Sequence, residues 1–223
     1  MTSMEKRRIG IIGGTFNPIH NAHLFVAECA REQFELDRVI FIPSGESYFK
    51  KDQDIPSGEI RYQLVKKATE DNPFFKVSRI EIDRPGDTYT IETLEQLAEM
   101  YPGDELFFIV GADTLNIIDK WVRYEDVLRA CTILAAVRDD TDEENLKKRI
   151  EELKGMVPQA NIETIRMGRI EISSTMIRER VKADKSIKYL LPEACIEYIA
   201  LKGLYSEDGA SDDVMDAPDK IIP

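Results

Sequence analysis

The chain has 223 residues, of which 43% are hydrophobic and 32% charged, so it can form one globular domain with a substantial core. Its net charge of −12 argues against a general nucleic-acid binder, because such proteins usually present a basic face. No stretch approaches the ~18 apolar residues of a membrane span or resembles a signal peptide, and the three scattered cysteines lack metal-type spacing, so we expect a cytoplasmic protein with reduced thiols.

The first predicted element is a strand that begins at Arg8 and ends at the glycine pair Gly13-Gly14. Its three isoleucines are typical of a strand buried on both faces of a parallel sheet. Further strands are expected over 38–43, 74–83, 105–110, 132–137 and 162–167, and helices over 23–35, 58–71, 89–101, 124–130, 143–153, 174–182 and 192–202. This alternation predicts a doubly wound, mainly parallel α/β sheet of the Rossmann-like kind, with three α/β/α layers.

Residues 1–205 are expected to form this single domain. The remaining segment, 206–223, contains six acidic residues and one lysine but little apolar mass. We therefore expect an acidic, mobile C-terminal tail.

Two histidines stand directly behind the glycine pair that ends the first strand. Gly13 and Gly14 let a ligand approach the backbone at the edge of the sheet where open α/β folds bind ligands. A plain turn would explain the glycines, but it would not explain why His20 and His23, the only histidines of the chain, both follow. Metal ligation would need a third and usually a fourth ligand, which the spacing does not supply. Phosphate recognition by two imidazoles near a helix N-terminus fits better.

A second polar cluster precedes the predicted helix 174–182. Its hydroxyl residues, Ser173-Ser174-Thr175, are typical of an N-cap, and capping alone would account for them. Arg178, however, is expected near the same helix N-terminus, where a cation opposes the helix dipole. A bound anion would reverse that effect, so the combination indicates a binding site.

Two further residues stand where a nucleotide could bind. Asp113 follows the predicted central strand 105–110 and could accept a hydrogen bond from a ribose hydroxyl, although aspartate also caps helices. Trp121 is the only tryptophan and is expected in a loop. Its indole offers a flat face to an aromatic ring, and core packing is the alternative.

Residues 13–23 and 172–178 resemble the two signature motifs of a nucleotidyltransferase family. They are most similar to the branch of that family that adenylates nicotinate mononucleotide. The first family motif is G-(G/S)-(T/S)-F-(D/N)-P followed by (H/T)-x-x-H, and residues 13–23 match it, with Asn17 for the commoner Asp and Ala22 for the commoner Gly. The second motif is I-S-(S/T)-(S/T)-x-(I/V)-R, and residues 172–178 match it at every position. The resemblance runs in order over nearly all of residues 8–205.

The resemblance implies a nucleotidyltransferase-type fold and adenylyl transfer from ATP to nicotinate mononucleotide. The products would be nicotinate adenine dinucleotide (deamido-NAD) and pyrophosphate, in NAD biosynthesis. It assigns catalysis to His20, His23 and Arg178. It assigns ATP binding to Gly13, Gly14, Thr15, Phe16, Lys50, Gly111, Asp113, Ile172, Ser173 and Ser174. Lys50 is the weakest of these, because it stands where the family commonly has Pro-His-Lys and a solvated lysine explains it nearly as well.

The acceptor is assigned by resemblance to Asn17, Tyr89, Thr90 and Trp121. Residues 88–94 resemble the family motif S-Y-T-x-D-T-L, with Thr88 for Ser and Glu92 for Asp, and in that family backbone groups at the Tyr-Thr step receive the pyridine carboxylate. Mg²⁺ is expected to bind with ATP, and no protein metal site is expected.

Alternatives remain open at this stage. Nicotinamide mononucleotide is the nearest alternative acceptor, whereas phosphopantetheine fits less well because that branch usually has Thr in place of His20 and a shorter chain. A nucleotide sensor without turnover is the alternative from another functional class. Neither a nucleic acid nor a membrane is expected as a partner, and a homo-oligomer is left open because no residue pattern decides it.

Overall fold

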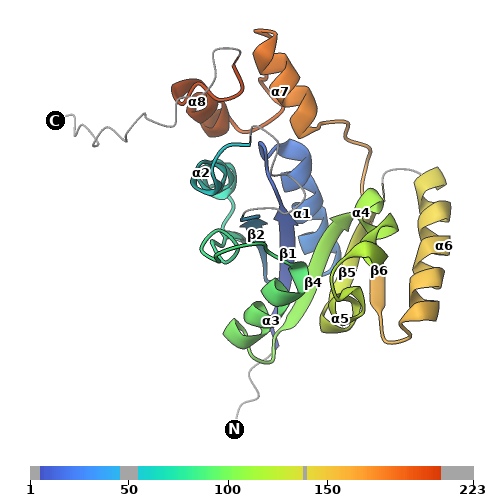
Figure 1. Ribbon diagram of the computed structural model, residues 1–223. Coiled ribbons are helices and arrows are strands. Elements are labelled where there is room, and N and C mark those ends of the chain that lie inside the picture. The colour runs from blue at the N-terminus through green and yellow to red at the C-terminus, as the bar shows by residue number, and fades with distance from the viewer. Residues whose placement is uncertain (1–5, 46–54, 138–139, 207–223) are drawn as a thin grey trace.

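The computed structural model describes residues 6–45, 55–137 and 140–206 (Figure 1). Its strands form one six-stranded sheet in the order β3-β2-β1-β4-β5-β6, and every pair of neighbours is parallel. The strands are β1 (Arg8–Gly14), β2 (Arg38–Pro43), β3 (Phe75–Val77), β4 (Glu105–Gly111), β5 (Thr132–Val137) and β6 (Asn161–Arg166). The prediction of a doubly wound parallel sheet is confirmed.

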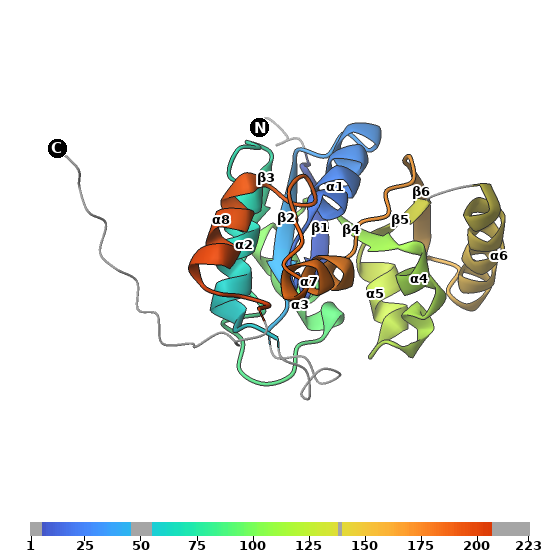
Figure 2. The ribbon, with the colours of Figure 1, turned by 90° about the horizontal axis from the view of Figure 1, so that it is seen from above.

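Helices cover both faces of this sheet (Figures 1 and 2). They are α1 (Asn21–Gln33), α2 (Gly58–Thr69), α3 (Thr90–Met100), α4 (Ala112–Asn116), the 3₁₀ helix η2 (Ile118–Lys120), α5 (Tyr124–Ala130), α6 (Asp140–Met156), α7 (Ser174–Lys182) and α8 (Glu193–Leu201). Among the described helices, none combines the length and the apolar character that a membrane crossing needs.

Two apolar cores lie on opposite sides of the sheet, because successive side chains of a strand point to opposite faces. On β2, Ile40 and Ile42 belong to the core under α3, α4, α5 and α6, whereas Val39 and Phe41 belong to the core under α1, α2, α7 and α8. The same alternation recurs on β4. This arrangement gives the three layers that the sequence predicts.

The prediction of a strand over 74–83 is wrong, because only Phe75–Val77 pairs with β2. Beyond it the chain turns, and the amide of Asp83 donates to the carbonyl of Arg79 at 2.9 Å. The alternation of Ile80 and Ile82 favours a strand, but Ile80 packs against the core under α3 from this turn instead. The short helices α4 and η2 were not predicted, because five and three residues are too few to show a helical period.

Several helix boundaries also differ from the prediction. Helix α1 begins at Asn21, two residues before the expected start, so His20 becomes its N-cap. Helix α6 extends beyond the predicted 143–153 at both ends. The predicted acidic tail and Lys50 lie outside the described residues, apart from Ser206.

The strand order changes direction between β1 and β4. The chain moves outward from β1 through β2 to β3, then returns to the other side of β1 and continues through β4, β5 and β6. Ligands of open α/β sheets bind outside the carboxyl ends of the strands at such a switch point.

Candidate active site

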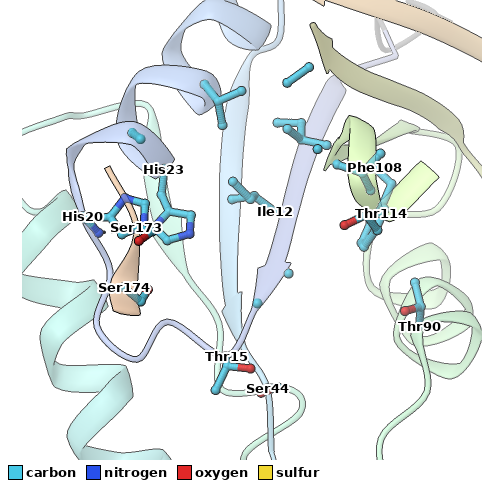
Figure 3. A pocket seen from close by; sticks show the side chains of 18 of the residues that line it. Ile12, Thr15, His20, His23, Ser44, Thr90, Phe108, Thr114, Ser173 and Ser174 are labelled. Carbon is cyan, nitrogen blue, oxygen red and sulfur yellow. Dashed lines mark hydrogen bonds between the residues drawn. The ribbon is translucent and has the colours of Figure 1, made fainter. Parts of the chain in front are cut away.

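A cavity of about 720 Å³ opens at this switch point. Its wall draws on segments far apart in the sequence: the end of β1, the start of α1, the start of α3, the end of β4 and the start of α7 (Figure 3). From the predicted site residues it includes Gly13, Gly14, Thr15, His20, His23, Thr90, Gly111, Trp121, Ile172, Ser173 and Ser174.

The other predicted residues lie around this wall. Phe16 and Asn17 are buried behind it, and Tyr89 is the N-cap of α3. Asp113 is exposed on α4, whereas its neighbour Thr114 lines the cavity (Figure 3). A contact from Asp113 to a ligand therefore requires that the ligand extend over the rim.

The two histidine rings stack on each other beside the loop that follows β1. Their centroids are 3.7 Å apart with an interplanar angle of 23°, and the ring of Phe16 meets His23 edge-on at 5.2 Å. The amide of His20 donates to Nδ1 of His23 at 3.2 Å. Because Nδ1 accepts this bond, the neutral His23 ring carries its proton on Nε2, which is then a hydrogen-bond donor.

Burial keeps both rings uncharged. It lowers the pKa of His20 to about 4 and that of His23 to about 3, where the neighbouring ring adds a smaller effect. Among the described residues, Nδ1 of His20 has no hydrogen-bond partner although it is buried. The pair therefore offers neutral imidazoles that a bound anion would convert toward cations.

The N-terminus of α7 is docked against the loop after β1. Oγ of Ser173 caps the helix by accepting from the amide of Met176 at 3.1 Å, as the sequence predicts. Oγ of Ser174 donates to the carbonyl of Pro18 at 2.8 Å.

Arg178 joins the same loop from one turn further along α7. It donates to the carbonyl of Asn17 at 2.8 Å and to Oγ1 of Thr175 at 3.3 Å. Contrary to the prediction from the sequence, a cation at this helix end does not by itself indicate a bound anion, because the Asn17 carbonyl already accepts a hydrogen bond from the guanidinium.

The opposite end of the cavity holds aromatic and hydroxyl residues. Trp121 is half-buried and meets the ring of Phe108 at 6.1 Å with an interplanar angle of 84°. Thr88 and Thr90 line the same end at the start of α3. Of the described residues that form the wall, none is an arginine or a lysine.

Glu81 and Ser44 also line the cavity, and sequence reasoning missed both. Thr93 donates to the Glu81 carboxylate at 2.8 Å, and burial raises the pKa of this acid. The sequence predicts a strand over 74–83, which does not indicate that Glu81 faces a ligand site. Ser44 directly follows β2, and its position at the carboxyl end of a parallel strand was a usable signal.

The chain is similar to known proteins over most of its length. Residues 11–180 match the family described as cytidylyltransferase-like. A probable nicotinate-nucleotide adenylyltransferase of Lachnoclostridium phytofermentans is 44% identical over 199 residues, which cover 89% of this chain and 99% of the relative. One of Moorella thermoacetica is 46% identical over 202 residues, covering 89% and 91%. The chain belongs to the nicotinate-nucleotide adenylyltransferase family.

A solved structure has the same fold at much lower sequence identity. Plasmodium falciparum nicotinic acid mononucleotide adenylyltransferase, complexed with NaAD, superposes with a TM-score of 0.72 at 18% identity, covering 89% of this chain and 97% of that one. The family and fold that the two sequence motifs predict are therefore confirmed.

Proposed function

We propose that the protein transfers AMP from ATP to nicotinate mononucleotide, forming nicotinate adenine dinucleotide and pyrophosphate in NAD biosynthesis. One observation carries this proposal: His20 and His23 line the same cavity as Ser173 and Ser174, which stand some 150 residues later in the chain. The relatives with 44% and 46% identity are named for this activity.

The reaction needs alignment and charge neutralisation more than acid–base chemistry. A phosphate oxygen of the acceptor attacks the α-phosphorus of ATP, the bond from that phosphorus to the β-bridging oxygen breaks, and pyrophosphate leaves. The attacking oxygen is already anionic, so no protein base is required. We infer that the Nε2–H of His23 donates to the phosphate chain; the bond that its Nδ1 accepts and the stacked ring of His20 support this role.

We assign the two ends of the cavity to the two substrates. The phosphates of ATP would lie between the histidines and the start of α7, and its nucleoside would lie toward Gly111, with Asp113 at the rim. The pyridine ring would lie toward Trp121, and the start of α3 would receive its carboxylate.

Mg²⁺ would arrive with the nucleotide. In the part of the chain that the structure describes, no three His, Cys, Asp or Glu side chains gather to hold an ion. Oxygen ligands from phosphates suit Mg²⁺ well, and the ion would reduce repulsion between the anionic reactants. We place the reaction in the cytoplasm, which is consistent with three cysteines that are all free thiols.

A pyrophosphate-release assay with ATP and Mg²⁺ tests the proposal. Nicotinate mononucleotide, nicotinamide mononucleotide and phosphopantetheine are offered in turn, and we expect the fastest release with the first. Nucleotide binding by calorimetry without release for any acceptor would instead indicate a sensor.

A further inference from the structure

Arg61 is a buried arginine on α2 whose side chain contacts the loop that follows β1. Its side chain donates to three carbonyls of three different segments: to Thr15 at 2.9 Å, to Pro56 at 3.0 Å and to Gly45 at 3.4 Å. The residue is only 4% exposed. Among the described residues no carboxylate forms an ion pair with it, and Glu81 is a carboxylate whose charge acts on it from a greater distance.

This burial has a cost that packing alone does not explain. A guanidinium removed from water without a paired carboxylate is unfavourable, and burial lowers the pKa of Arg61 accordingly. An apolar residue of similar size would avoid the cost of the buried charge, but it would leave the three carbonyls without these donors. The charge and the fork of donors are therefore the features that need a reason.

The loop that Arg61 contacts has a strained backbone. Phe16 has φ +49°, a left-handed conformation that is uncommon for a bulky side chain. Such a conformation is unfavourable and persists only where the surroundings hold it. The surroundings here include two arginines, because Arg61 holds the carbonyl before Phe16 and Arg178 holds the carbonyl after it.

We propose that Arg61 is a positioning residue of the triphosphate site, which holds the Thr15–Phe16 peptide so that its N–H can bind a phosphate oxygen. In a trans peptide the C=O and N–H groups point in opposite directions. Because Arg61 holds the C=O against α2, the N–H is directed away from α2, on the side where Thr15 lines the cavity (Figure 3).

The charge of Arg61 also favours phosphate binding at this loop. The described wall of the cavity contains no arginine or lysine, so a cation one hydrogen bond behind the loop adds positive potential where the polyphosphate would bind. This inference rests on the proposed function, because it presumes that the loop receives phosphates.

The test compares Arg61→Ala and Arg61→Lys with the control Arg79→Ala. Arg79 is also tied to α2, through an ion pair with Glu59 at 2.6 Å, but it lies outside the cavity wall. We expect Arg61→Ala to lower kcat/KM for ATP about 100-fold, the size of effect that a small misplacement of reacting groups produces. Arg61→Lys should lose most of the same activity, because an ammonium cannot form the planar fork. Arg79→Ala should stay within about twofold.

Two readouts separate positioning from stability. The first is the affinity for inorganic tripolyphosphate by calorimetry, at a folded fraction fixed by near-ultraviolet circular dichroism. We expect it to fall in both Arg61 variants. The second is rescue: millimolar guanidinium should raise the kcat of Arg61→Ala with saturation, whereas equal sodium chloride or urea should not.

Each other result overturns the inference. A folded Arg61→Ala with unchanged tripolyphosphate affinity and unchanged kcat/KM would show that the loop does not need the arginine. If Arg61→Ala does not fold, Arg61→Lys decides, and a folded Arg61→Lys with wild-type kinetics overturns the proposal. If neither variant folds, Arg61 is a stability residue only. A wild-type protein without pyrophosphate release refutes the proposed function instead, and tripolyphosphate binding can still be compared between variants.

Discussion

His20 and His23 present two uncharged rings to the cavity, and this state follows from where each ring lies. His20 is the N-cap of α1 and is 6% exposed, and His23 is held by the His20 amide and by the edge of Phe16. Neutral rings without a carboxylate partner are suited to donate hydrogen bonds to an anion that enters the site.

His23→Ala should lower kcat about 10²–10³-fold, the usual effect of losing one preorganised donor in a reacting site. The fold should survive, because the residue lies at the first turn of α1, at the cavity rather than within either apolar core. Steady-state kinetics and thermal unfolding measure the two effects. Wild-type turnover in the variant would remove His23 from the mechanism.

The free energy of unfolding should fall as the pH drops from about 6.5 toward 4. The folded protein binds protons on His20 and His23 more weakly than the unfolded chain, because burial lowers their pKa values to about 4 and about 3. Above pH 6.5 both states leave these rings neutral, so this effect vanishes there. Urea unfolding at pH 7.5 and 5 measures it, and His20→Gln should show a weaker dependence than the wild type. Equal dependence in both would contradict the assignment.

At the scale of elements, helix N-termini meet at the cavity. Helix α1 begins within the motif of residues 13–23, and α7 begins within the motif of residues 172–178. Helix α3 begins at Thr90, which lines the cavity together with Trp121. The partial positive charge of such ends favours phosphates and carboxylates. Helix α7 has the additional role of holding the loop after β1, through Ser174 and Arg178.

Ser173→Ala should reduce the free energy of unfolding by about 1 kcal/mol, because it removes the cap of α7. It should also raise the KM for ATP, since the same hydroxyl lines the cavity. Ser57→Ala is the matched control: Ser57 caps α2 by accepting from the Ile60 amide at 3.4 Å but lies outside the cavity wall. An unchanged KM in both variants would limit Ser173 to capping.

Nicotinate mononucleotide should react with a kcat/KM at least ~100-fold above that of nicotinamide mononucleotide, a gap of ~2.7 kcal/mol. The described wall near Trp121 offers no arginine to the carboxylate, so the N–H groups at the start of α3 must discriminate. Trp121→Ala should impair both acceptors, because stacking does not distinguish the substituent. Comparable wild-type rates would disprove the preference for the acid while leaving adenylyl transfer intact.

At the scale of the whole molecule, two apolar cores cover the two faces of the sheet, and the cavity lies at the carboxyl ends of its strands. The strands β1, β2, β4 and β5 are nearly continuous apolar runs, as expected where both faces are covered, and polar residues of the cavity wall follow their carboxyl ends. The sheet therefore carries the site at the carboxyl ends of its strands, and core residues away from this edge, such as Leu134, do not line the cavity.

Leu134→Ala should illustrate this separation. Leu134 is fully buried on β5, so its truncation should cost about 2–5 kcal/mol of unfolding free energy. The KM values of the folded protein should not change, because Leu134 lies outside the cavity wall. The control is Leu201→Ala, whose side chain is 71% exposed and whose loss should matter by less than about 0.5 kcal/mol. Denaturant unfolding and steady-state kinetics test both.

Local patterns in the sequence determined the alternation of strands and helices, the glycine turn after β1, the cap at Ser173 and the family. These features depend on neighbours within a few residues, through strand burial, backbone freedom and capping. Only the tertiary structure decided that 80–83 turns instead of continuing β3, and that Glu81 and Ser44 line the cavity. It also decided that Arg61 holds the carbonyl of Thr15, 46 residues away, and that Arg178 holds that of Asn17, 161 residues away. Such bonds form only when folding brings distant segments together, so the sequence predicted Arg178 as a site residue but neither its carbonyl partner nor the role of Arg61.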